Sequence, residues 1–195
     1  MLSPYSPFYN AHCIRCRLPK PACVCEKLIQ TGLPFTIMLC SHSKEWQRND
    51  NTGQWAVLSS PNIKRYRWHR KPELISPRLS MPSSQPEPGH FLLFPGDNSL
   101  PITPSMQTIT HLWVIDGTWQ EAQKMLNQSS WLKSLPQVSI TSATSKFVLR
   151  RNQQGLSTME AIEWAIREGF PNDHSANILM NNFNLLQNQL VNLLR

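Results

Sequence analysis

Four of the five cysteines in the chain stand close together near its beginning, in the spacing C-x2-C-x6-C-x-C: Cys13, Cys16, Cys23 and Cys25. Two close pairs of thiolates can give zinc its preferred tetrahedral ligation by four sulfur atoms. In a chain without a secretory signal, this density of cysteines points to metal rather than to disulfides. We therefore expect a structural zinc site, since four thiolates leave no position open for a substrate. The alternatives are reduced structural cysteines and a redox pair.

A carboxylate stands at the other place where the sequence indicates chemistry. Asp116 follows the apolar run 112–115 and comes directly before Gly117, Thr118 and Trp119. An acidic residue is thus expected where a buried strand ends and a helix begins. Ligands of open α/β sheets bind at such points, because strand ends and helix N-termini meet there in a crevice. Asp116 is therefore the candidate centre of a ligand site.

Positive charge is concentrated in residues 64–71, which carry five permanent cations and two aromatic rings. Because cations neutralise phosphates and flat rings stack on unpaired bases, this run is a candidate RNA contact through Lys64, Arg65, Arg67 and Arg70. The alternative is an exposed basic edge strand without a partner. The whole chain has 19 basic and 12 acidic residues, a formal net charge of +7, which favours an acidic partner such as nucleic acid.

The hydrophobic pattern indicates the elements that must position these groups. Strands are expected at 35–40, 91–94, 109–115, 138–141 and 147–149. Helices are expected at 54–58, 118–127, 157–169 and 175–194, with a polar loop at 97–108. Thr118 with Glu121, and Ser157 with Glu160, have the spacing of a capping box at the start of two of these helices. Strands that alternate with helices predict an α/β fold with a mainly parallel sheet and helices on both faces. The turns after residues 94, 115 and 156 could then gather at one edge of that sheet.

The chain has 195 residues, enough for one sizeable core and a small added module. No apolar run approaches the roughly 18 residues that a membrane span needs, and the first residues lack the regions of a signal peptide. We expect a soluble cytoplasmic protein without a membrane partner. An N-terminal arm with the zinc module is expected at 1–30 and a catalytic domain at 31–195. A monomer and a dimer are both compatible with the sequence.

Five motifs in this order resemble the DTW-domain family of RNA 3-amino-3-carboxypropyltransferases, which use S-adenosylmethionine. The first is the four-cysteine motif. The others are His42-x2-Glu45-x2-Arg48-x2-Asn51-Thr52-Gly53, Leu93-Phe94-Pro95-Gly96, Asp116-Gly117-Thr118-Trp119, and Arg150-Arg151 followed by Leu156-Ser157-Thr158-Met159-Glu160-Ala161. Together they extend along nearly the whole chain. Without the resemblance, His42, Glu45 and Arg48 would be interpreted as a solvated helix face with an ion pair.

The resemblance implies a SPOUT-like fold with a C-terminal trefoil knot, which periodicity alone would not suggest. It also implies that three turns form the S-adenosylmethionine pocket, with candidate residues Leu93, Pro95, Gly96, Asp116, Gly117, Thr118, Trp119, Ser157, Thr158 and Glu160. Trp119 would lie against the adenine or the sulfonium, or simply pack in the core. Arg48, Arg150 and Arg151 are candidates for the cofactor carboxylate or for an RNA phosphate.

The activity that the resemblance implies is transfer of the 3-amino-3-carboxypropyl group of S-adenosylmethionine to N3 of a uridine in tRNA. Methylthioadenosine is then the leaving group. Because N3 carries a proton, the reaction needs a base, and Asp116 is the candidate catalytic residue, either as that base or as a group that only orients the site. Two other functions compete with this one: a SPOUT-type RNA methyltransferase that uses the same cofactor, and a zinc-stabilised RNA-binding module without activity.

Overall fold

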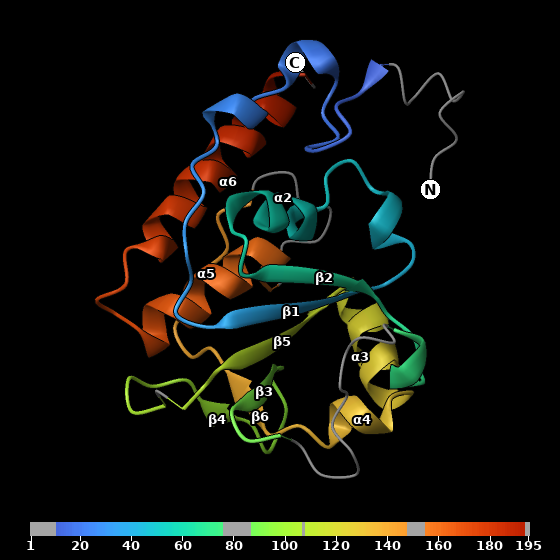
Figure 1. The fold of residues 1–195 in the computed structure, drawn as a ribbon, viewed down its shortest axis with the longest axis vertical. Coiled ribbons are helices and arrows are strands. Elements are labelled where there is room, and N and C mark those ends of the chain that lie inside the picture. Colours follow the sequence, from blue (N-terminus) through green and yellow to red (C-terminus); the bar gives the residue numbers. More distant parts are fainter. Residues whose placement is uncertain (1–10, 76–86, 107, 148–154, 194–195) are drawn as a thin grey trace.

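Six strands form one sheet in which every neighbouring pair runs parallel, in the order β2-β1-β5-β3-β6-β4 (Figure 1). The structure is a computed structural model that describes residues 11–75, 87–106, 108–147 and 155–193. Its strands are β1 (Thr36–Ser41), β2 (Ile63–Arg67), β3 (His90–Leu93), β4 (Leu100–Pro101), β5 (His111–Asp116) and β6 (Gln137–Ser139). The predicted α/β fold with a mainly parallel sheet is therefore confirmed.

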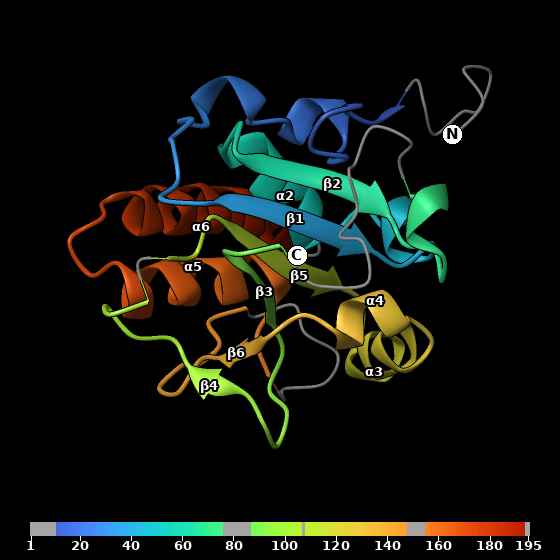
Figure 2. The ribbon, with the colours of Figure 1, turned by 60° about the horizontal axis from the view of Figure 1, so that its bottom comes forward.

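Helices cover both faces of this sheet (Figures 1 and 2). One face carries α2 (Thr52–Ser59), α5 (Thr158–Gly169) and α6 (Ser175–Asn192), which contact one another. The other face carries α3 (Trp119–Asn127) and the short α4 (Ser130–Lys133). The 3-10 turns among the described residues are η1 (Lys20–Ala22), η2 (Cys25–Lys27), η3 (Glu45–Gln47) and η4 (Pro72–Leu74). None of the helices in the described segments has the length and hydrophobicity needed to cross a lipid bilayer.

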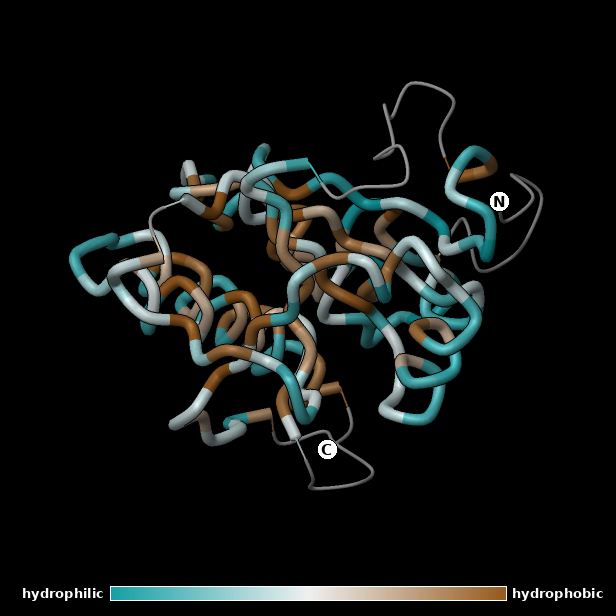
Figure 3. Tube along the Cα trace, turned by 90° about the horizontal axis from the view of Figure 1, so that it is seen from below, coloured by the Kyte–Doolittle hydropathy of each residue, from teal (hydrophilic) through white to brown (hydrophobic). Residues whose placement is uncertain are grey.

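The alternation of side chains along the central strands explains these two layers. In β1, Ile37 and Leu39 pack in the cluster under α2, α5 and α6, whereas Met38 and Cys40 pack in the cluster under α3 and α4. Successive residues of this strand are all apolar, because a parallel sheet is covered on both sides. Figure 3 shows hydrophobic segments running through the middle of the molecule. Cys40 is fully buried, as expected of a core residue, and burial raises the pKa of its thiol.

The parallel arrangement brings the carboxyl ends of the strands to one edge of the sheet. At this edge Ser41 of β1 lies in register with Asp116 of β5 on one side and with Arg67 of β2 on the other. Leu93, the last residue of β3, is in register with Val114 of β5. The turns that follow β1, β3 and β5 therefore leave the sheet next to one another, where a ligand site was expected.

Several element boundaries differ from the sequence prediction. Helix α2 begins at Thr52 rather than at residue 54, because the side chain of Asn51 caps it. Two residues of the predicted loop at 97–108 form β4, which pairs with β6. In the predicted strand 147–149, Phe147 belongs to no strand and packs against aromatic rings of the core, and residues 148–149 lie outside the described residues.

Candidate functional site

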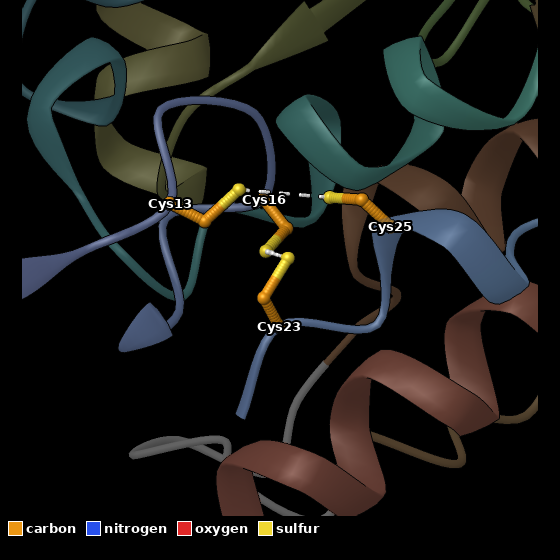
Figure 4. A group of neighbouring side chains, drawn as sticks. All are labelled: Cys13, Cys16, Cys23 and Cys25. Atoms are coloured by element: carbon orange, nitrogen blue, oxygen red, sulfur yellow. Dashed lines mark hydrogen bonds between the residues drawn. The ribbon is translucent and has the colours of Figure 1, made fainter. Parts of the chain in front are cut away.

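The four cysteines come together from two separate turns of the chain. The turn between Cys13 and Cys16 is closed by a backbone hydrogen bond from the N–H of Arg17 to the C=O of Cys13. All four sulfur atoms lie within 4.8 Å of one another and point toward one another (Figure 4). The Sγ atoms of Cys13 and Cys25 are 3.8 Å apart, and so are those of Cys16 and Cys23.

These distances match the demands of a tetrahedral metal site. A zinc ion with four sulfur bonds of about 2.3 Å separates the sulfur atoms by about 3.8 Å. The thiols differ in acidity: backbone hydrogen bonds from Cys16 and Arg15 outweigh burial and lower the pKa of Cys13 to about 7, whereas burial raises the pKa of Cys16 and of Cys25. The four cysteines can therefore hold a metal ion such as zinc.

The turn between Cys13 and Cys16 also contacts the segment of the second family motif, residues 42–53, and the helix that follows it. The guanidinium of Arg17 donates to the backbone C=O of Arg48 at 3.0 Å, and the side-chain amide of Gln54 donates to the backbone C=O of Arg15 at 3.0 Å. Cys16 is fully buried in the same hydrophobic cluster as α2 and α6. Direct contacts thus join the candidate metal site to the start of α2.

The carboxylate of Asp116 lies at the end of β5, and its side chain is 2% exposed. Its Oδ1 accepts hydrogen bonds from Asn51 Nδ2 at 3.1 Å and from Thr158 Oγ1 at 2.9 Å. Its Oδ2 accepts from Ser41 Oγ at 2.7 Å and from the guanidinium of Arg65 at 3.0 Å. A carboxylate offers roughly four lone-pair sites, so donors from β1, β2, α5 and the residue before α2 fill nearly all of its capacity. We call these five residues the Asp116 network.

The approach of α2 to Asp116 requires a glycine at position 53. A Cβ atom on Gly53 would lie 2.8 Å from Cγ and Oδ2 of Asp116 and 2.9 Å from Oδ1. The side chain of Asn51 caps the helix by accepting from the N–H of Gln54 at 2.7 Å, while its amide group donates to Asp116. The carboxylate therefore lies against the first turn of α2, where the helix dipole favours negative charge.

Arg65 belongs to this network although the sequence predicts it on an RNA-contacting surface. Its side chain is 5% exposed. Besides Asp116, it donates to Ser41 Oγ at 2.8 Å and to Gln54 Oε1 at 2.7 Å, and it lies 4.5 Å from the centre of the Trp46 ring. Burial lowers the pKa of Arg65, and the charge of Asp116 opposes this. The donors of Arg65 are thus engaged inside the protein.

A second carboxylate lies beside the network. Glu45 is buried in η3, and its Oε2 accepts from Asn51 Nδ2 at 2.8 Å, so that one amide group bridges Glu45 and Asp116. Its Oε1 lies 3.3 Å from Arg48, whose guanidinium also donates to Asp50 at 2.9 and 2.8 Å. Burial raises the pKa of Glu45, and the hydrogen bond from Asn51 opposes this. The expected ion pair is present, but Glu45 faces inward instead of lying on a solvated helix face.

The start of α5 carries the predicted capping box. The hydroxyl of Ser157 accepts from the N–H of Glu160, and the carboxylate of Glu160 accepts from the N–H of Ser157 at 2.8 Å. Glu160 is buried and also accepts from Ser145 Oγ at 3.1 and 3.0 Å. Ser157 and Glu160 therefore build the turn that presents Thr158 to Asp116.

An aromatic pair with one exposed ring and one buried ring lies on the α3 face of the same edge. Trp119, the first residue of α3, stacks on Phe94 with ring centres 5.3 Å apart and an angle of 14° between the rings. Phe94 stands between Leu93 and the Pro95-Gly96 turn. Trp119 is 53% exposed, so it does not simply pack in the core. The turns after β3 and β5 thus meet through these two rings. The start of α3 is fixed by the predicted capping box of Thr118 and Glu121.

Exposed basic side chains gather on and after the edge strand β2: Lys64, Arg67, His69, Arg70 and Lys71. The guanidinium of Arg67 lies 5.5 Å from the ring centre of Trp46. Both sequence interpretations, an RNA contact and an exposed basic edge, are compatible with this placement. Arg150 and Arg151 lie outside the described residues.

Some members of the site were missed by sequence reasoning. Ser41 directly follows the apolar run of β1, so the rule that singled out Asp116 at a strand end would also have found it. Gln54, which joins Arg65 to the cysteine turn, gives no such signal, because its role depends on contacts between distant segments.

Comparison with known proteins identifies the family. The family model described as DTW domain matches residues 10–191, which is nearly the whole chain and includes all five motifs. No solved structure matches the chain. On the extent of the family match, the chain belongs to the DTW-domain family.

Proposed function

We propose that the protein transfers the 3-amino-3-carboxypropyl group of S-adenosylmethionine to N3 of a uridine in tRNA. Membership of the DTW-domain family is consistent with a tRNA-modifying role. The observation that carries the finer proposal is the Asp116 network, a rigid polar centre at the carboxyl edge of the sheet. The exposed ring of Trp119 and the exposed cation of Arg67 lie at the same edge, which suits a nucleoside cofactor and a phosphate-rich substrate.

The proposed reaction forms one bond and breaks one bond. The electron pair of uridine N3 attacks the γ-carbon of the aminocarboxypropyl chain, and the C–S bond breaks with its electron pair passing to sulfur. The sulfonium charge is thereby neutralised, methylthioadenosine leaves, and the N3 proton passes to a base. No redox change occurs. The protein must therefore orient the two substrates, shield the methyl carbon from attack and take up one proton.

The pocket residues support the cofactor in different ways. Trp119, which stacks on the buried Phe94, offers an exposed ring surface for the adenine or the sulfonium. Leu93, Pro95 and Gly96 form the turn beside these rings, and Gly117 with Thr118 forms the turn after β5. Ser157 and Glu160 are engaged in their capping box, and Thr158 is bound to Asp116. We assign these last three residues to the shape of the pocket rather than to direct contact with the cofactor.

Asp116 orients the site in this proposal rather than accepting the proton. A base needs a lone pair that the substrate can reach. Both oxygens of Asp116 already accept hydrogen bonds from protein donors, and the side chain is 2% exposed. The second of the two roles expected for Asp116 is therefore the better supported.

The RNA would reach this edge along β2. Lys64, Arg67 and Arg70 are exposed there, and Trp46 lies beside Arg67. Such a surface can neutralise phosphates and stack on an unpaired base. Arg48 is already paired with two carboxylates, so we assign it to the support of Glu45. Arg150 and Arg151 remain candidates for the cofactor carboxylate or an RNA phosphate.

Zinc in the four-cysteine site would have a structural role, because four thiolates leave no open coordination position. We also propose that the chain has a SPOUT-like C-terminal trefoil knot, for which the parallel sheet is supporting evidence. An experimental structure that follows the chain through residues 148–154 tests the knot directly.

Nucleoside analysis of tRNA from cells with and without this protein tests the proposed activity. We expect the aminocarboxypropyl uridine to disappear from cells that lack the protein and to return when it is supplied. Loss of a methylated nucleoside instead, with S-adenosylhomocysteine as by-product, favours the methyltransferase. Binding of tRNA without binding of S-adenosylmethionine in calorimetry favours the RNA-binding module.

A further inference from the structure

A histidine and a glutamate that the proposed function has not used face each other at the carboxyl edge of the sheet. His42 is the first residue after β1, and its backbone N–H donates to the C=O of Asp116 at 2.9 Å. Glu121 lies in the first turn of α3. Nδ1 of His42 is 3.3 Å from Oε1 of Glu121, and each side chain is 17% exposed. The pair is therefore partly open to solvent beside the buried network.

The surrounding residues hold both side chains in place. Oε2 of Glu121 accepts from the N–H of Thr118 at 3.0 Å, which leaves Oε1 for His42. The ring of His42 stacks on Trp68 with centres 6.3 Å apart and an angle of 27° between the rings. Trp68 is itself fixed, because its indole N–H donates to Ser129 at 2.9 Å.

One further residue touches both members of the pair. The backbone N–H of Lys44 donates to Nδ1 of His42 at 3.4 Å, and Nζ of Lys44 lies 3.9 Å from Oε1 of Glu121. The contact of Nδ1 with the carboxylate of Glu121, at 3.3 Å, is shorter than its contact with the N–H of Lys44, and a carboxylate can only accept. We therefore place the imidazole proton on Nδ1, toward Glu121. In the described part of the chain, no group hydrogen-bonds to Nε2 of His42, so this tautomer leaves its lone pair open to a substrate.

We propose that His42, oriented by Glu121, is the group that accepts the N3 proton of the target uridine. This inference rests on the proposed function. The N3–H bond breaks and its proton binds Nε2, while the electron pair of that bond stays on N3 and forms the new N3–C bond. The C–S electron pair passes to sulfur as methylthioadenosine leaves. Glu121 stabilises the imidazolium until the proton passes to water.

The two buried carboxylates near the site are less suited to this step. Asp116 accepts hydrogen bonds at both oxygens, and Glu45 has a side chain that is 9% exposed and bound by Asn51 and Arg48. His42 also lies where the two substrates would meet. It follows β1, which stands between the basic strand β2 and strand β5, and its partner Glu121 lies in the same helix turn as Trp119.

Kinetics of the full-length protein with S-adenosylmethionine and tRNA from cells lacking the protein test this assignment. We expect His42→Ala to lower kcat by about 10²- to 10⁴-fold, the range for loss of a general base. Its affinity for S-adenosylmethionine in calorimetry should stay within about threefold of the wild type, because the cofactor contacts remain. Added imidazole should restore part of the activity, which a structural defect would not allow.

Two further variants distinguish a loss of the orientation of the His42 ring from a general loss of folding. Glu121→Gln keeps the capping box, in which glutamine also serves, but removes the charge that orients His42. We expect kcat to fall by at least about tenfold, since a neutral partner favours the wrong imidazole tautomer. His174→Asn, at the exposed start of α6, is the matched histidine control and should leave kcat unchanged.

Each possible result either supports or overturns the assignment of His42 as the base. A His42→Ala protein whose kcat stays within about threefold of the wild type overturns the assignment, and so does a loss of activity that imidazole does not restore. A loss of cofactor affinity that matches the loss of kcat overturns it as well. If the wild-type protein forms no aminocarboxypropyl uridine, the proposed function fails and this inference fails with it. An active wild type together with an active His42→Ala rejects the base assignment alone.

Discussion

Contacts around the start of α2 connect the four-cysteine site to the Asp116 network. The two clusters are nevertheless built from different kinds of chain segments. The cysteines come from one stretch, residues 13–25, and converge through local turns. The network draws Ser41, Asn51, Arg65, Asp116 and Thr158 from distant parts of the chain. The parallel sheet and the helices α2 and α5 packed on it bring these five residues together.

The two clusters also differ in what they need from outside the protein. Four sulfur atoms at metal-binding distance form a complete site only when a cation balances the thiolates. The carboxylate of Asp116 is already balanced by Arg65 and by three further donors. We infer that the first cluster depends on a ligand, whereas the second is a preorganised part of the fold that positions others.

Removal of the Asp116 carboxylate should have the largest effect on stability. Asp116→Ala leaves the guanidinium of Arg65 buried without its counter-charge, and breaking a buried ion pair in this way costs about 3–5 kcal/mol. Urea unfolding followed by circular dichroism measures this change. Asp97→Ala, at an exposed turn after β3, is the control and should change stability by less than about 0.5 kcal/mol. Equal effects of the two substitutions would contradict the idea of a preorganised centre.

Removal of the metal should affect the four-cysteine cluster more than the Asp116 network. Chelation, or Cys16→Ser with Cys25→Ser, should release the ion and remove on the order of several kcal/mol of metal-linked stability from the module. Hydrogen exchange should then increase in residues 13–25 and at the Gln54 contact, while cofactor affinity in calorimetry falls only a few-fold. If chelation abolishes cofactor binding, the two clusters form a single unit and the contrast between them is wrong.

A methyl group at position 53 tests how closely the network is packed. Gly53→Ala places a Cβ 2.8 Å from the carboxylate of Asp116, so we expect it to destabilise the fold by about 1–3 kcal/mol through overpacking. Gly32→Ala is the matched control, because its Cβ would meet nothing closer than Asn62 Oδ1 at 3.9 Å. Thermal unfolding of the two variants compares them. A Gly53→Ala protein as stable as Gly32→Ala would show that the network is loose.

The smallest effect on stability is expected at the aromatic pair. Trp119→Ala should lower the free energy of unfolding by about 0.5–1.5 kcal/mol, through loss of its stacking contact with Phe94. Loss of a cation–π contact worth about 0.5–2 kcal/mol should nevertheless weaken S-adenosylmethionine binding by about two- to thirtyfold. Leu100→Ala, another exposed apolar side chain, should leave that affinity unchanged. Equal affinities of wild type and Trp119→Ala in calorimetry would remove Trp119 from the pocket.

The same contrast explains how much could be predicted from the sequence. The cysteine cluster was predictable in full, because its spacing alone carries the chemistry. The central strands and Asp116 at the end of β5 were also predictable, since continuous apolar runs and capping boxes are local signals. The burial of Arg65 was not, because the basic run around it is typical of a solvated surface. Its place depends on pairing between β1 and β2, which no local pattern encodes.

Short and irregular elements were the other limit of prediction. Strand β4 has two residues and exists only through its pairing with β6. In η3 the side chain of Glu45 is buried, although the charged residues around it predict a helix face exposed to solvent. In both segments a long-range contact outweighs the local preference. Ser41, by contrast, could have been predicted. It follows the apolar run of β1 just as Asp116 follows that of β5, so the same rule for strand ends applies to both.

The fate of the two labels of a doubly labelled cofactor tests the central claim most directly. S-adenosylmethionine carrying one label in the carboxyl carbon and another in the methyl group is incubated with the purified protein and tRNA from cells lacking it. We predict that the carboxyl label enters the tRNA while the methyl label stays in methylthioadenosine. Entry of the methyl label into the RNA, with the carboxyl label left in S-adenosylhomocysteine, would contradict the proposed transfer.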